Sequence, residues 1–237
     1  MFDVYHDNGT LSLSTQTYPL RLFKSFTMNV VTNRMNQGGA ASFYVDQAPG
    51  NLLNQQDCLI FMRHSKPGAT TTVWYEGRPS QPYQQSHPYG LPLWIASDVP
   101  GTVQVYVCKL MSAAQAPAVN FGIELYDDKG LRTFSSATHL VGLQRMINPA
   151  LTTSGTLATS TMAWGSSMEA FYRYFDNPFL MTWNQGVAFT GAAFTCYALG
   201  YVHHGGPAFC YRKVLDPSIP VVPVLFIETA NLPIPYN

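Results

Sequence analysis

Phe2-Asp3-Val4-Tyr5-His6-Asp7-Asn8-Gly9 and Ile123-Glu124-Leu125-Tyr126-Asp127-Asp128-Lys129-Gly130 are two versions of one stretch, 121 residues apart. In each, apolar and polar residues alternate and run into an Asp that is followed two residues later by Gly. Alternation is typical of a half-buried β-strand, and a glycine in this position can adopt the positive φ of a tight turn. Both stretches therefore predict a β-hairpin, with Gly9 and Gly130 in the turns.

The spacing of 121 residues continues beyond the two hairpins. It aligns Ser14 with Ser135, Leu22 with Leu143, Leu59-Ile60 with Leu180-Met181, and Val103-Gln104-Val105-Tyr106 with Val224-Leu225-Phe226-Ile227. A spacing this long matches a whole β domain, because solenoid units recur roughly every 20–50 residues. We therefore predict an all-β protein of two tandem, internally duplicated β-sandwich-like domains, residues 1–116 and 117–237, joined near residues 111–118.

Local patterns predict the remaining elements. Seventeen prolines and 18 glycines leave little room for long helices. Ser166 and Glu169 have capping-box spacing and predict one short helix at Ser167–Phe175. The further strands predicted are Leu59–Arg63, Thr71–Tyr75, Gly101–Lys109, Leu180–Trp183, Phe189–Leu199 and Pro220–Thr229. Loops are predicted at Thr152–Thr156 and Arg78–Gly90, the second with Tyr83 and Tyr89 exposed for contact.

The composition favours permanent contact with other protein subunits. Charged residues are 11% of the chain, 46% are apolar and 14% are aromatic. Interfaces bury aromatic side chains and are depleted of charged residues. The alternative interpretation is a neutral β protein with a large core, which would have the same percentages of charged, apolar and aromatic residues. The 13 basic and 13 acidic residues cancel, and no basic run exists to bind phosphates or anionic lipid. We expect neither nucleic acid nor membrane as a partner.

The chain carries no predicted export or membrane signal. The stretch Met1-Phe2-Asp3-Val4-Tyr5 lacks the basic and apolar regions of a signal peptide, and no apolar run approaches a spanning helix of ~20 residues. Folding in a cytoplasm is the resulting expectation. The four cysteines have no cysteine at the aligned position of the other half, which favours free, packed thiols over a disulfide framework: Cys58, Cys108, Cys196 and Cys210.

No motif predicts catalysis, a cofactor or a metal site. Asp7 and Asp128 stand close to turn glycines, where Asp is common because it hydrogen-bonds the local backbone. Adjacent histidines such as His203 and His204 point in opposite directions on a strand and do not easily share a metal ion. No nucleophile elbow, zinc-binding helix or phosphate-binding loop is present in the sequence. The predicted catalytic, cofactor and metal residues are therefore none, and the protein is predicted not to be an enzyme.

The tryptophans leave a second function open. Exposed indoles could stack on sugar rings, although large aromatics more often fill sandwich cores. The residues concerned are Trp74, Trp94, Trp164 and Trp183. A carbohydrate-binding adhesin or receptor-binding protein, with host cell-surface glycan as its ligand, is the alternative to a structural protein. A hydrolase on a β scaffold is a third possibility, because fold does not decide function.

The two hairpin stretches, Phe2-x-Val4-Tyr5-x-Asp7-x-Gly9-x-x-x-x-Ser14 and Ile123-x-Leu125-Tyr126-x-Asp128-x-Gly130-x-x-x-x-Ser135, resemble the start of small tail-region structural proteins of long-tailed bacteriophages. The resemblance covers about 20 residues of each half and brings no catalytic residues. It implies a virion protein of the tail tip, baseplate or tail-fibre attachment, assembled in the host cytoplasm. Its expected partners are other virion tail proteins and further copies of itself, such as a trimer that presents six similar units.

Overall fold

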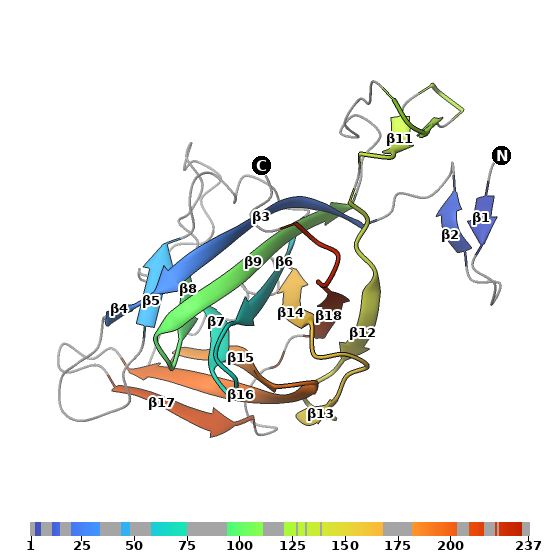
Figure 1. Cartoon of the computed structure of the whole chain (residues 1–237). Coiled ribbons are helices and arrows are strands. Elements are labelled where there is room, and N and C mark those ends of the chain that lie inside the picture. Colours follow the sequence, from blue (N-terminus) through green and yellow to red (C-terminus); the bar gives the residue numbers. More distant parts are fainter. Residues whose placement is uncertain are drawn as a thin grey trace.

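The structure is a computed structural model of the whole chain, and it is all-β. It describes residues 3–5, 11–14, 20–33, 44–47, 58–74, 94–110, 121–126, 128–130, 132–137, 139–167, 182–202, 209–215, 221 and 223–233. Within these ranges every regular element is a strand, and the strands pair antiparallel. No helix suited to crossing a membrane occurs in this part of the chain. The all-β prediction is confirmed (Figure 1).

The first large sheet has six strands in the order β12-β18-β14-β6-β9-β3. Its longest members, β3 and β9, run side by side (Figure 1). Neighbours pair continuously, so that β6 of the first half meets β14 of the second half in the middle of the sheet. The strands are β3 (Leu20–Val30), β6 (Cys58–His64), β9 (Gly101–Leu110), β12 (Leu143–Ile147), β14 (Met162–Ser167) and β18 (Val224–Glu228).

The second large sheet has the order β13-β16-β15-β7-β8-β5-β4, with β17 also paired to β16. Here too the halves meet in the middle, where β7 pairs with β15. The strands are β4 (Thr32–Asn33), β5 (Tyr44–Gln47), β7 (Thr70–Trp74), β8 (Trp94–Ser97), β13 (Ser154–Thr156), β15 (Thr182–Thr190), β16 (Ala193–Val202) and β17 (Phe209–Val214).

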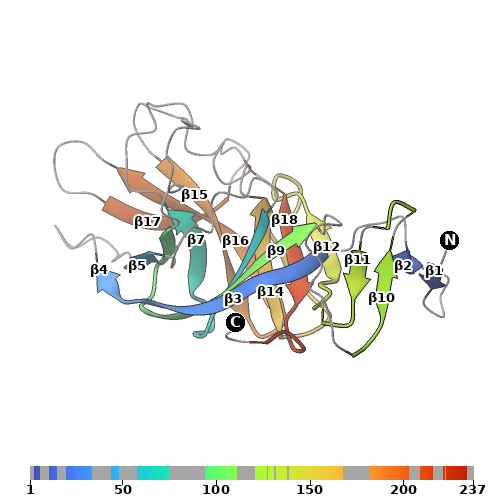
Figure 2. The same cartoon turned by 90° about the horizontal axis from the view of Figure 1, so that it is seen from above.

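Two small hairpins lie at one end of the molecule, away from the large sheets, in both views (Figures 1 and 2). They are β1 (Asp3–Tyr5) with β2 (Leu11–Ser14), and β10 (Glu124–Tyr126) with β11 (Arg132–Ser135). Asp3 pairs with Ser14 as Glu124 pairs with Ser135, and both ladders have an irregularity after the second residue of the first strand. Gly130 has φ +75°, as predicted for the turn.

The two halves of the chain share both large sheets. In the six-stranded sheet, three strands of the second half lie beside three of the first, and the second sheet is divided in the same way. In the described strands, residues 1–116 and 117–237 therefore do not form separate sheets, because strands of both halves pair within each large sheet. A local repeat indicates similar units, but it does not reveal whether each unit closes its own sheets or pairs with the other unit.

A β-bulge lets the edge strand β3 contribute to two cores. Leu22 pairs with Cys108 and Lys24 pairs with Val107, so one residue of β3 is extra at this point. The extra residue changes which face the following side chains occupy. Before the bulge, Leu20 and Leu22 join a cluster with Phe61 and Tyr106; after it, Phe26, Met28 and Val30 join the main core between the two sheets.

Strand β12 has the same bulge at the aligned position. Leu143 pairs with Ile227 and Arg145 pairs with Phe226. Since Leu22 pairs with Cys108 in the first half, Ile227 is the counterpart of Cys108, a spacing of 119 residues (227 minus 108). The predicted alignment of Val103–Tyr106 with Val224–Ile227 at a spacing of 121 is therefore two residues out of register.

Several local predictions can now be compared with the described strands. Strands predicted near β6, β7, β9 and β18 are present. Phe189–Leu199 is not one strand, because Gly191, with φ +61°, turns the chain between β15 and β16. Ser154–Thr156, predicted as a loop, is β13. Ser167, the first residue of the predicted helix, ends β14, and Met168–Phe175 lies outside the described residues.

Candidate interaction surface

In the part of the chain that the structure describes, exposed apolar side chains are concentrated in one segment. Among the described residues nine large hydrophobic side chains are exposed, and seven of them fall between residues 121 and 151. They are Phe121, Ile123, Tyr126, Leu140, Leu143, Met146 and Leu151. Scattered exposed hydrophobics are normal on a protein surface, but a cluster is typical of a contact site. These seven residues, which are close together in the sequence and lie at the β10–β11 hairpin and on or beside β12, are called the apolar surface below.

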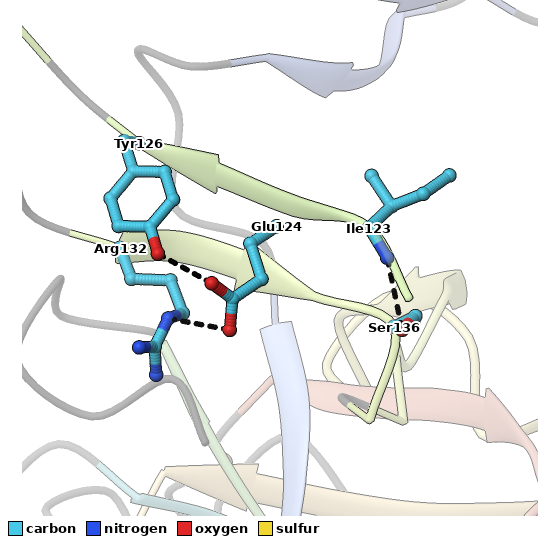
Figure 3. Close-up of polar contacts among 5 residues, drawn as sticks. All are labelled: Ile123, Glu124, Tyr126, Arg132 and Ser136. Atoms are coloured by element: carbon cyan, nitrogen blue, oxygen red, sulfur yellow. Dashed lines mark hydrogen bonds and ion pairs between the residues drawn. The ribbon is translucent and has the colours of Figure 1, made fainter. Parts of the chain in front are cut away.

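The first part of the apolar surface is the β10–β11 hairpin (Figure 3). The Glu124 carboxylate lies 3.0 Å from Nε of Arg132 and accepts a hydrogen bond from the Tyr126 hydroxyl. At the open end of the hairpin, the Ile123 N–H donates to Oγ of Ser136 at 3.3 Å, and the Ser136 N–H donates to the Ile123 carbonyl at 2.8 Å.

Glu124 and Arg132 form an ion pair within the hairpin. The Tyr126 hydroxyl and the Glu124 carboxylate raise the pKa of Arg132, which stabilises the ion pair in its charged form. Phe121, just before β10, is 98% exposed. Because two strands alone are only marginally stable in water, a hairpin of this kind is expected to gain stability from a neighbouring surface.

The second part of the apolar surface is β12, an edge strand of the six-stranded sheet. Leu143 and Met146 are exposed, whereas Ile147 is buried in the main core. Arg145 lies between them in the strand, and its side chain contacts other elements. Its Nη1 donates to the Thr156 carbonyl at 3.1 Å, and its guanidinium lies 5.8 Å from the Phe194 ring centroid. A charged residue commonly protects an edge strand, and here it leaves two apolar side chains accessible.

Of the residues considered for chemistry in the sequence, only Asp128 lies in the described part of the chain. Asp128 lies in the turn before Gly130, as predicted. Asp7, His203 and His204 lie outside the described residues, as do Tyr83 and Tyr89. Among the described residues no group of three metal-ligating side chains comes together.

Trp164 is a core residue. Its side chain is fully buried in the main core, and Nε1 donates to the Thr71 hydroxyl at 2.6 Å, from β14 to β7 of the facing sheet. An indole in this position cannot stack on a sugar, which removes one of the four tryptophans from the alternative function. Trp74, Trp94 and Trp183 belong to β7, β8 and β15.

The strongly shifted titratable groups have structural partners. Burial acts to raise the pKa of Glu228, but hydrogen bonds from Thr159, Thr161 and the backbone N–H groups of Ala230 and Thr229 lower it to about 2. These bonds fix the turn after β18, with both N–H contacts at 2.9 Å. Burial raises the pKa of the Cys196 thiol to about 12. Neither value is near neutrality, where a general acid, base or thiolate nucleophile works best.

His64 is held by the turn between β6 and β7. Its Nδ1 accepts from the Lys66 N–H at 2.9 Å, and its Nε2 lies 3.1 Å from the Val99 carbonyl. Burial lowers its pKa, so the neutral ring is favoured. Because both ring nitrogens have backbone partners, this histidine stabilises the turn.

The apolar surface is thus the one feature of the described chain that suggests contact with another molecule. No family model, curated protein or solved structure matches this chain. The sequence predicted aromatic contact residues but did not predict the exposed apolar residues of β12. The β-bulge in this strand interrupts the alternation by which a strand is recognised. The alignment of Leu143 with Leu22 at a spacing of 121 residues was the sequence feature that could have indicated β12.

Proposed function

We propose that this chain is a structural protein of a bacteriophage tail, an assembly module of the tail tip, baseplate or tail-fibre attachment. The observation that carries the proposal is the apolar surface, which would be costly to leave in water on a protein with so few charges. The opening sequence of each half, which resembles tail-region proteins, supplies the identity of the assembly. On this proposal the chain contributes contacts and no catalysis.

The fold supports an internally duplicated, sandwich-like architecture in which the duplicates are interleaved. Both hairpins have the same register and irregularity, and both edge strands have the same bulge. The order β3-β9-β6 of the first half is followed by β14-β18-β12, in which β18 and β12 are the counterparts of β9 and β3. The strand order of the second unit is the reverse of the first across the β6–β14 pair, as in a two-fold dimer.

Duplication suits a protein that lies where parts of different symmetry meet. Each chain presents two similar hairpins at the same end of the molecule (Figure 2). Three chains would then present six similar hairpins, two from each chain, to neighbouring tail proteins, and the chain would be assembled with them in the host cytoplasm.

The location of the protein in a particle tests the proposal. Antibodies against the purified chain, used for immunogold labelling of particles of the virus that encodes it, should label the tail. Particles free of the chain by labelling and by mass spectrometry would contradict the proposal.

Variants of the hairpin test whether the apolar surface is what matters. Phe121→Asp should reduce the yield of complete particles at least ten-fold in a complementation assay, because a charge would be buried in the contact. Ala137→Asp is the matched control, since it adds the same charge at an exposed position just after the hairpin. Equal yields from both variants would show that the hairpin is not the assembly contact.

A further inference from the structure

One unbroken row of paired residues crosses the whole six-stranded sheet, and its two ends differ. Consecutive pairings join Ser25 to Tyr106, Tyr106 to Phe61, Phe61 to Gly165, Gly165 to Leu225 and Leu225 to Met146. Ser25 and Met146 are aligned positions of β3 and β12, three residues after Leu22 and Leu143 respectively. Ser25 and Met146 therefore occupy equivalent positions at the two edges of the sheet.

At the β3 end this place is covered by the segment that follows β18. The Ser25 hydroxyl donates to the Pro233 carbonyl, and Leu232 packs against the cluster that contains Leu22. The segment is anchored at its start, where the Thr229 N–H donates to the Thr161 carbonyl at 3.1 Å. Residues 139–141 also pair with this end of β3, where the Leu22 N–H donates to the His139 carbonyl at 2.8 Å. Under these two segments Leu22 is 2% exposed and Ser25 is 1% exposed.

At the β12 end the equivalent position is exposed. Leu143 is 52% exposed and Met146 is 69% exposed, although their backbone pairing and bulge match those of Leu22 and Ser25. Met146 replaces a hydroxyl donor by a flexible apolar side chain, which adapts to apolar partners of varied shape. The difference therefore lies in the cover over the strand, since the strand itself is built in the same way.

We propose that the Leu143–Met146 face binds an extended, apolar, proline-containing segment of a neighbouring chain, as the Leu22–Ser25 face holds Leu232-Pro233 of its own chain. The internal counterpart defines the chemistry of the occupant: a leucine-sized side chain over the cluster and a proline-restricted backbone crossing the strand. The inference deepens the assembly role by naming this chemistry, and it rests on that role for the identity of the neighbour.

A peptide in trans tests the proposal on the full chain. The probe is a fluorescently labelled peptide of residues 229–237, which contains the Leu232 and Pro233 that contact the internal counterpart. Fluorescence anisotropy should show saturable binding of one peptide per chain. Met146→Asp should weaken it at least ten-fold, as should Leu232→Asp within the peptide. Val31→Asp, which adds the same charge at an exposed apolar position outside the apolar surface, should leave binding unchanged.

The remaining outcomes decide against the proposal. Absence of saturable binding at millimolar peptide would overturn it, and so would equal binding by Met146→Asp, which would place the peptide on β3 in exchange for the chain's own segment. Met146→Gln repeats the test with a neutral side chain, in case the aspartate variant unfolds. Peptide binding together with particles that lack the chain would retain this inference and remove the tail assignment, so the two failures are distinguishable.

Discussion

Phe61 and Gly165 pair at the centre of the six-stranded sheet, where β6 of the first half meets β14 of the second. A Cβ atom on Gly165 would lie 1.9 Å from the Ile60 carbonyl oxygen and 2.8 Å from Cδ1 of Phe61. The Phe61 ring thus occupies space that a side chain at residue 165 would need. The close approach of β6 and β14, where the two halves meet, therefore requires a residue without a side chain at position 165.

Gly165→Ala should destabilise the protein strongly. The obstructing atom at 1.9 Å belongs to the backbone, so β6 and β14 must separate locally to admit a methyl group. Overpacking of this kind typically costs about 1–3 kcal/mol, and we expect the upper end or more. Urea unfolding measures the loss. Gly142→Ala is the control, because its Cβ would meet only a flexible glutamine side chain at 3.4 Å. Equal stability of the two variants would show that the halves are not packed this closely.

The hydrogen bond between Trp164 and Thr71 should contribute to the packing of one sheet on the other. Trp164→Phe leaves a buried hydroxyl without its donor and also creates a void, so the free energy of unfolding should fall by about 2–4 kcal/mol. Thr71→Val leaves the indole N–H unsatisfied and should cost about 1–3 kcal/mol. In a double-mutant cycle the two losses should be less than additive. Full additivity would show that the two side chains do not interact.

Glu228 should make the stability of the protein depend on acid pH. Its pKa in the folded protein is about 2, below the ordinary value of 4.5, so the unfolded chain takes up the proton first as the pH falls. The stabilisation is present above pH 4.5 and is lost between pH 4.5 and about 2. Glu228→Gln should flatten the stability profile in this window, as measured by urea unfolding. A wild-type slope in Glu228→Gln would assign the acid sensitivity elsewhere.

The elements predicted correctly are those determined by neighbouring residues. The β10–β11 hairpin follows from the alternation of Ile123–Tyr126 and from Gly130, and both signals lie within eight residues. The long strand β3 was not predicted, because its bulge moves the buried positions to the other face after Leu22. A pattern with one change of face does not match the simple period of a strand.

The arrangement of the halves could not be read from the repeat. Leu59 was aligned with Leu180, whereas the six-stranded sheet pairs β6 with β14. Which strand becomes a neighbour depends on the free edges of both units, and alignment of one unit with the other contains no such information. The same holds for the apolar surface: Leu143 and Leu22 look equivalent in sequence, and only the fold shows that one is covered and the other is not.

Cutting the chain between its halves tests the interleaved fold directly. A protease site inserted between Ala113 and Ala114 allows the purified, folded protein of 26.2 kDa to be cleaved after folding. The two pieces should remain together on size-exclusion chromatography, because the β6–β14 and β7–β15 pairings and the main core join them. They should separate only in denaturant. Two independent sandwiches would instead part after cleavage and elute at half the mass, which would restore the division into residues 1–116 and 117–237.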